Sequence, residues 1–253
     1  IFRHRQAAFL IALQLLRARQ DLGSEEMIGR ERLQLDGIGA ELARQKWLKH
    51  DSAEMSVEQL LEKIAPGFPH PEGIFYPDTY VFERGSSDLI IYQQAHQQLM
   101  KKLEQAWAAR MTGLPYDNPY EALIMASIVE KETGNPQERP IIAGVFLNRL
   151  KKPMRIESDP TVVYAALLEH RYNGVIHKSD LANHNPYNTY QTDGLPPGPI
   201  ANPGAAALQA VLHPEPTKYL FFVAKPEGGA HRFSETLAEH NRAVQDYRHG
   251  LKR

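Results

Sequence analysis

A chain of 253 residues can bury a substantial core, and it suits one large domain or a large domain with a small one. The formal net charge of -1 argues against a nucleic-acid-binding surface, and the absence of cysteine excludes disulfides and thiolate metal sites. No run of about 18 apolar residues occurs, so no membrane-spanning helix is predicted within this sequence.

The N-terminal part of the chain is charged and contains little proline. Its most apolar segment, residues 7–16, has the length of a signal-type core or a shortened anchor, but we interpret it as one amphipathic or buried helix. Two more helices are predicted, over residues 31–47 and 56–64. Ser56 and Gln59 form a capping-box pattern at the start of the second.

A cluster of helix-breaking residues follows, at Pro66, Pro69, Pro71 and Gly73. We place a domain boundary there. The sequence therefore predicts a small N-terminal subdomain, residues 1–70, and a main domain, residues 71–253.

The main domain alternates helical and extended patterns. Helices are expected over residues 88–110 (a long polar helix on the surface), 137–150, 159–174 and 205–212, and from a cap at Ser234 to about residue 249. Asp159, followed by Pro160, is the expected cap of the helix over residues 159–174. Extended segments are expected over residues 74–82 and 219–224. Helices mixed with a few short strands predict an α+β fold.

The segment 118–134 carries the strongest signals. Asn118 suits an N-cap, Pro119 suits the first helical position, and Gly134 is placed for a left-handed residue after the helix. Residues 122–129 are apolar on nearly every face, so this helix is expected to be buried all round.

Two acids follow that apolar run, Glu130 and Glu132. Residues i and i+2 lie about 200° apart around a helix, so the two carboxyls cannot face one cleft. Glu130 lies above the smaller side chains and is the better candidate for acid chemistry, whereas Glu132 is expected to pair with Arg139 or Arg149. The alternative is that both are solvated acids at a frayed helix end.

Eight sequence blocks of the main domain follow one another in a characteristic order and spacing: 126–133, 145–150, 158–162, 186–190, 194–200, 203–204, 213–214 and 219–224. The series resembles the YceG-like endolytic murein transglycosylases, the MltG family. The resemblance covers about residue 73 to the C-terminus. It implies a YceG-like catalytic domain over residues 71–253.

This resemblance implies a lyase that cleaves the β-1,4 bond between N-acetylmuramic acid and N-acetylglucosamine inside peptidoglycan strands. The products would end in 1,6-anhydromuramic acid, and the reaction would terminate nascent glycan elongation. Glu130 falls on the family's catalytic glutamate and would act as general acid and then as general base. Attack by the muramic C6 hydroxyl replaces the water and the second carboxylate of ordinary glycosidases. Apolar surroundings would keep the Glu130 carboxyl protonated.

Five further residues are candidates for substrate binding, and neither a metal nor another cofactor is expected. Hydroxyl, amide and aromatic groups suited to sugar rings occur at Tyr187, Asn188, Thr189 and Tyr190. A role in ordering their own loop is the alternative. Asn148 either bonds Glu130 or the substrate, or lies at the surface.

The family plan also includes a single anchor in the bacterial inner (plasma) membrane, a LysM-like domain and a catalytic domain in the periplasm or outside the cell. Residues 1–70 would hold the LysM-like subdomain, although the first thirty residues lack the expected strand pattern. The anchor is expected outside this sequence. The implied partners are peptidoglycan strands and penicillin-binding peptidoglycan synthases, and no nucleic acid is expected.

Two other functions compete with this interpretation. One is a non-catalytic peptidoglycan-binding or scaffold protein of the cell-wall synthesis machinery. The other is a metal-dependent hydrolase, but the candidate ligands show no i, i+4 pair of a helical zinc motif: His177, His184, His213, His231 and His240.

Overall fold

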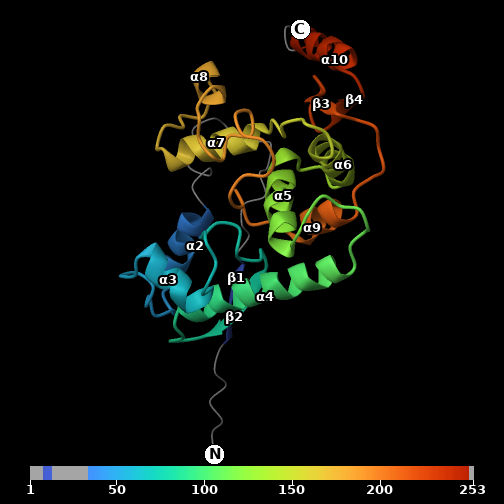
Figure 1. Cartoon of the computed structure of the whole chain (residues 1–253). Coiled ribbons are helices and arrows are strands. Elements are labelled where there is room, and N and C mark those ends of the chain that lie inside the picture. The colour runs from blue at the N-terminus through green and yellow to red at the C-terminus, as the bar shows by residue number, and fades with distance from the viewer. Residues whose placement is uncertain (1–7, 13–33, 251–253) are drawn as a thin grey trace, which may run out of the picture.

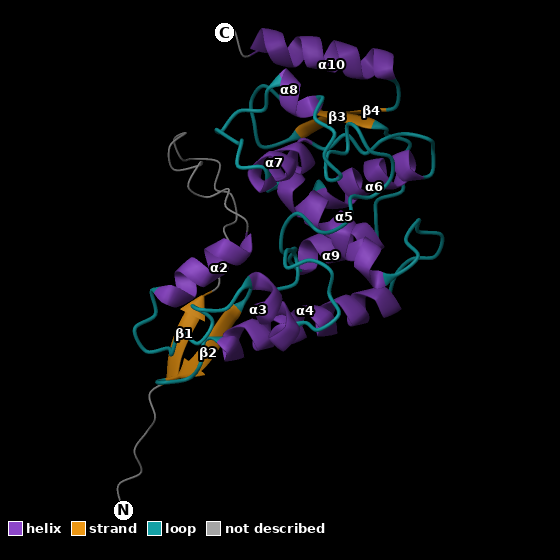
Figure 2. Ribbon diagram, turned by 60° about the vertical axis from the view of Figure 1, so that its left-hand side comes forward, coloured by secondary structure: helices purple, strands orange, loops and turns teal. Residues whose placement is uncertain are grey.

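The computed structural model describes residues 8–12 and 34–250. In chain order the elements are β1 (Ala8–Ala12), α2 (Gln34–Ala43), α3 (Val57–Ile64), β2 (Thr79–Glu83), α4 (Leu89–Ala108), α5 (Pro119–Glu132), α6 (Arg139–Leu150), α7 (Asp159–Leu168), α8 (Lys178–Leu181), α9 (Ala205–Leu212), β3 (Phe221–Ala224), β4 (His231–Ser234) and α10 (Leu237–Gly250). Helices dominate and the strands are short, which confirms the α+β class (Figures 1 and 2).

The N-terminal strand contradicts one prediction. Residues 8–12 were expected in a helix, but they form β1, which pairs antiparallel with β2 from Ala8 opposite Glu83 to Ala12 opposite Thr79. The partner strand lies about 70 residues away, so a local apolar pattern could not reveal it. β1 and β2 lie on the two sides of the domain boundary expected near residue 70, which stays a prediction.

Two N-terminal helices agree with the sequence pattern. α2 falls within the helix expected over residues 31–47, of which residues 31–33 lie outside the described ranges. α3 starts with the expected capping box, in which the Gln59 N–H donates to the Ser56 hydroxyl and the Ser56 N–H donates to the Gln59 side chain.

Residue Asp88 joins this N-terminal part to the rest of the chain. Its buried carboxylate accepts from the Ser52 hydroxyl at 2.6 Å and from the Ser52 N–H at 3.1 Å. Backbone bonds link Lys49 to Ser86 and Asp88 on the other segment. α4 begins directly after this junction. It was expected at the surface, but one of its faces is buried against the core, through Ile91, Tyr92, Ala95, Leu99 and Leu103.

Helix α5 lies at the centre of the helices α4, α6, α7 and α9, as Figure 1 shows. All of residues 122–129 are buried, which confirms the predicted all-round burial, and α5 contacts α4, α6, α7 and α9. The Asn118 side chain accepts from the Glu121 N–H at 3.0 Å, as expected of an N-cap. The left-handed residue expected at Gly134 is absent, because Thr133 ends the helix in extended backbone and its hydroxyl accepts from the Asn135 N–H.

Two other predicted caps were wrong. Ser158, not Asp159, is the residue before α7, and Asp159 is the first helical residue. Ser234 belongs to β4, and α10 is instead preceded by Thr236, whose hydroxyl accepts from the Glu239 N–H at 3.3 Å. α10 lies beside the β3–β4 hairpin at one end of the molecule (Figures 1 and 2).

Across residues 8–12 and 34–250, no helix combines the length and apolar character needed to cross a bilayer.

Candidate active site

The Glu130 carboxylate lies at the last turn of α5 and has two fixed donors. Its Oε1 accepts from Nη2 of Arg139 at 3.0 Å, and its Oε2 accepts from the backbone N–H of Gly204 at 3.0 Å. Arg139 is the first residue of α6, and Gly204 is the N-cap of α9. The Glu130 side chain is 19% exposed and that of Arg139 is 9% exposed, so both charges are largely withdrawn from water.

This environment differs from the expected apolar one. The body of α5 below Glu130 is buried among apolar side chains, but the carboxylate itself meets a guanidinium and a backbone N–H. Both partners donate a hydrogen bond to a carboxyl oxygen of Glu130. The helical pattern of α5 could not show them, because Gly204 is 74 positions further along the chain.

The segment at Tyr76 and Pro77 also borders this site. The Ala205 N–H hydrogen-bonds the Tyr76 hydroxyl, while burial, together with the negative charges of Asp78 and Glu130, raises the pKa of Tyr76. A Cβ at Gly204 would lie 3.7 Å from Oε2 of Glu130 and 3.8 Å from Cγ of Pro77. No residue on this side of the site was among the predicted site residues, although the sequence contains the aromatic block around Tyr76.

The second acid, Glu132, faces a different neighbour. The Ser158 hydroxyl donates to its Oε1 at 2.5 Å. Burial raises the pKa of Glu132 to about 7, Asp159 adds to the rise, and the Ser158 bond and the charge of Arg149 oppose it. The expected pairing of Glu132 with Arg139 was wrong, since Arg139 pairs with Glu130. Arg149 forms its ion pair with Glu157, at 2.9 Å.

Two candidate substrate ligands lie inside their own loop. Asn188 is fully buried, and its amide donates to the carbonyls of Asp180, Leu181 and Asn183. Thr189 is fully buried too, and its hydroxyl accepts from the Ser158 N–H at 3.0 Å. The Asn188 contacts hold the loop on α8 and the chain after it, and the Thr189 contact holds it at the start of α7.

The other three candidates also have protein partners. Tyr187 packs edge-on against Tyr164, with ring centroids 4.8 Å apart, and the Tyr190 hydroxyl donates to Asp159 at 2.6 Å. The Asn148 amide donates to the carbonyls of Thr217 and Tyr219 ahead of β3. Among the described hydrogen bonds, none joins these residues to Glu130.

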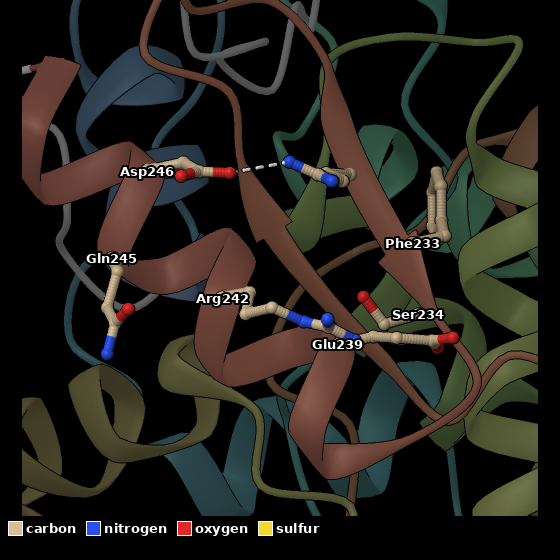
Figure 3. Close-up of a pocket in the computed structure, with 7 residues that line it drawn as sticks. Phe233, Ser234, Glu239, Arg242, Gln245 and Asp246 are labelled. Atoms are coloured by element: carbon tan, nitrogen blue, oxygen red, sulfur yellow. Dashed lines mark hydrogen bonds and ion pairs between the residues drawn. The ribbon is translucent and has the colours of Figure 1, made fainter.

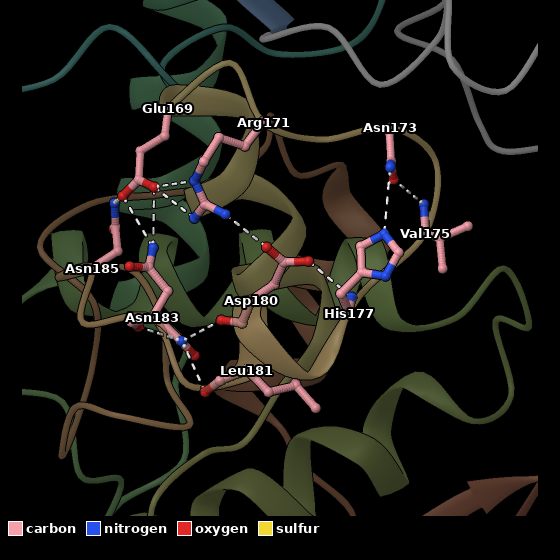
Figure 4. Close-up of polar contacts among 10 residues, drawn as sticks. Glu169, Arg171, Asn173, Val175, His177, Asp180, Leu181, Asn183 and Asn185 are labelled. Atoms are coloured by element: carbon pink, nitrogen blue, oxygen red, sulfur yellow. Dashed lines mark hydrogen bonds and ion pairs between the residues drawn. The ribbon is translucent and has the colours of Figure 1, made fainter.

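A polar network orders residues 169–185, the chain that follows α7 (Figure 4). The Glu169 carboxylate accepts from the amides of Asn185 and Asn183 and from Arg171, and these bonds, led by Asn185, lower the pKa of Glu169 to about 2. Arg171 also pairs with Asp180 at 2.8 Å. The chain between α7 and Tyr187 is thus fixed by side chains.

A hollow between β4 and α10 contains no part of this site. Its lining is largely polar and includes Glu239, Arg242 and Asp246, as Figure 3 shows. Arg232, which also lines it, pairs with Asp246 at 2.8 Å. The partners of Glu130 come from α6 and α9 instead.

Within the described ranges, no group of three or more His, Asp or Glu side chains is arranged to hold a metal ion. Two of the histidine candidates have other partners. His231 bonds the buried Glu138 at 2.8 Å, and His213 bonds the carbonyl of Ala109 at 2.8 Å.

Comparisons with known proteins place this arrangement in a family. The model of the YceG-like family matches residues 4–246. The chain belongs to the YceG-like family. A YceG-like protein of Listeria monocytogenes, solved by crystallography at 2.6 Å, has a similar structure, with a TM-score of 0.61 and 30% identity over 87% of this chain and 71% of that one.

Curated relatives of this YceG-like chain carry one name. The protein named "Endolytic murein transglycosylase" of Bacillus subtilis (strain 168) is 41% identical over 179 residues, which are 70% of this chain and 48% of that protein. The protein of the same name from Streptococcus pneumoniae serotype 2 (strain D39) is 28% identical over 70% of this chain and 32% of that protein. The chain therefore spans half or less of the length of these curated relatives.

Proposed function

We propose that this chain is the catalytic part of an endolytic murein transglycosylase. It cleaves the β-1,4 bond between N-acetylmuramic acid and N-acetylglucosamine within peptidoglycan strands and leaves 1,6-anhydromuramic ends. The names of the relatives support the substrate and the reaction class. The observation that carries the proposal is Glu130, a largely buried carboxylate with donors from two other helices.

The first step uses Glu130 as an acid. Its proton passes to the glycosidic oxygen, the bond from that oxygen to the muramic C1 breaks, and a carboxylate remains. Arg139 and the Gly204 N–H already point at the oxygens on which this negative charge appears. Donors that are in place before the reaction stabilise such a charge without reorganisation.

The second step uses the same group as a base. The muramic C6 hydroxyl attacks C1 of the same sugar, a new C1–O6 bond closes the anhydro ring, and the hydroxyl proton returns to Glu130. The attack is intramolecular, so no activated water is required. Glu132 is bonded to Ser158 on a different side of α5, in agreement with a mechanism that needs one carboxylate.

The loop 185–192 forms the substrate-facing part of the site in this proposal. Tyr190, which is partly exposed, offers an aromatic face, and the buried Tyr187 supports the loop from below by packing against Tyr164. Asn148 supports the neighbouring chain, while the internal bonds of Asn188 and Thr189 keep the loop rigid. The substrate is met outside the cytoplasm, with the protein held to the inner membrane by an anchor beyond the described residues. Penicillin-binding synthases are the proposed source of the nascent strands that it terminates.

Glu130→Gln tests the proposal. Uncrosslinked glycan strands are incubated with wild-type protein, with Glu130→Gln and with a control, Glu62→Gln, which removes an exposed carboxyl from α3. Mass spectrometry should find internal fragments with 1,6-anhydromuramic ends for wild type and control, and a loss of at least about a hundredfold for Glu130→Gln. Near wild-type turnover by Glu130→Gln would refute the role of Glu130. Products with reducing ends would show that water is the nucleophile.

A non-catalytic scaffold would not need this acid. That alternative would gain support from an exposed, solvated Glu130, whereas the side chain is 19% exposed and ion-paired.

A further inference from the structure

The guanidinium of Arg139 has unused donors. Its side chain is 9% exposed, and its described hydrogen bond is the one from Nη2 to Oε1 of Glu130. Its Nε is buried and has no hydrogen-bond partner among the described residues. A guanidinium carries five N–H donors, and leaving one buried without an acceptor is unfavourable.

The geometry of the unpartnered Nε donor indicates which kind of ligand group would bind to it. Nε and the neighbouring terminal nitrogen form one side of the planar fork, which binds the oxygens of a carboxylate or carbonyl group. Glu130 occupies only the terminal nitrogen. The N-terminus of α9 lies at the same place, since Gly204 also donates to Glu130, so the local potential favours another electron-rich oxygen.

The proposed reaction makes an additional acceptor for Arg139 more important. Glu130 must be neutral before it can protonate the leaving oxygen, and a neutral Glu130 no longer balances the charge of Arg139. A largely buried guanidinium without an anionic partner is strongly unfavourable. An acceptor oxygen supplied by the ligand would satisfy the unpartnered Nε of Arg139 and offset part of this cost.

We propose that Arg139 binds the lactyl carbonyl oxygen of the muramic sugar at the cleaved bond. This rests on the proposed function. Both sugars of murein carry an acetamido group, whereas only the muramic sugar carries the lactyl group. Its carbonyl is an amide where a stem peptide is attached and a carboxylate where the peptide has been removed, and both forms accept from a guanidinium. Arg139 thereby fixes which sugar presents its C1 to Glu130.

Ligand binding to Glu130→Gln, measured by calorimetry, tests this inference, because the variant is expected not to cleave the ligand. Its glutamine is also neutral, like the protonated glutamic acid that precedes the acid step. The ligands are a murein tetrasaccharide with stem peptides, the same tetrasaccharide with free lactyl carboxylates, and chitotetraose, which has no lactyl group. Glu130→Gln should bind at least one murein ligand about tenfold more tightly than chitotetraose. Equal affinity for all three ligands overturns the proposal.

The double variant E130Q/R139K keeps a positive charge but lacks the planar fork. We expect about tenfold weaker binding of the murein ligands, with chitotetraose changed less than twofold. Equal weakening of all ligands, or no weakening, overturns the proposal. A loss with one murein ligand alone supports it and identifies the amide or the carboxylate as the acceptor. Arg44→Lys, an exposed arginine on the surface, serves as the matched control.

The thermal midpoint of each variant shows that it is folded, and the ligand preference of Glu130→Gln stands even if the R139K substitution destabilises the chain. Product analysis of the wild type tests the reaction class independently. Absence of anhydro ends would refute the proposed function, whereas loss of the lactyl preference alone would refute only the role of Arg139.

Discussion

Replacing Glu132 by glutamine should stabilise the protein at neutral and alkaline pH. Burial raises the pKa of Glu132 from 4.5 to about 7. Between these values the unfolded chain has lost the proton that the folded chain still holds, so unfolding releases a proton and the free energy of unfolding falls as pH rises. One pKa unit corresponds to about 1.4 kcal/mol, and the rise therefore corresponds to at most about 3 kcal/mol above pH 7.

Glutamine removes this cost and keeps an oxygen that can accept from the Ser158 hydroxyl. Urea unfolding is measured at pH 4.5, 6 and 8 for wild type, Glu132→Gln and the exposed control Glu62→Gln. The advantage of Glu132→Gln over wild type should be near zero at pH 4.5 and grow to between about 1 and 3 kcal/mol at pH 8. A difference that does not change with pH, or that shrinks as pH rises, would refute the reasoning. The control should show no such growth.

Gly144→Ala should cost about 2 kcal/mol or more in urea unfolding, because its Cβ would lie 2.5 Å from the carbonyl oxygen of Glu215; an unchanged midpoint would contradict this close approach. The same change at the exposed helical Gly37, which has open space around it, should instead add about 0.5 to 1 kcal/mol. Asn118→Ala removes the bond to the Glu121 N–H and should cost about 1 kcal/mol, whereas Asn118→Asp should retain most of the stability. Asn188→Ala leaves three carbonyls without their donor and should cost about 3 kcal/mol, measured by thermal unfolding; a loss of activity at unchanged stability would assign Asn188 to the substrate instead.

Local signals were enough to predict the centre of the fold. Asn118, Pro119 and the apolar run 122–129 predicted both the start and the burial of α5. The capping box at Ser56 predicted the start of α3. In both cases the determining contacts lie within one helical turn, where sequence spacing fixes geometry.

The tertiary contacts of Glu130 and Glu132 could not be predicted from local sequence patterns. The spacing of Glu130 and Glu132 correctly assigned them to different sides of α5, but it could not identify the facing groups. Arg139 was assigned to Glu132, because the sequence does not show how the chain turns between α5 and α6. The Gly204 N–H and the Tyr76 hydroxyl reach the site through tertiary packing, which no local pattern encodes.

The strand β1 illustrates the same limit. An apolar stretch of ten residues is compatible with a helix or a strand, and only the edge of β2 decides between them. The predicted N-caps Ser234 and Asp159 were displaced from the true helix starts by one or a few residues. Each has a capping side chain, but the helix begins one or more residues away from the position that the residue type suggested.

The hydrogen bond from the Gly204 N–H to Glu130 makes the proposed acid-base site depend on the order in which the chain folds. Gly204 lies 74 residues after Glu130, at the end of the proline- and glycine-rich segment 194–204. A molecule that has formed α5 and α6 but has not yet docked α9 has the acid and the arginine without the backbone N–H. Contacts of such long sequence separation form late because closing the loop costs entropy first. The glycan cleavage proposed for this chain would therefore require α9 to be docked, because a partly folded molecule would lack one of the two donors to Glu130.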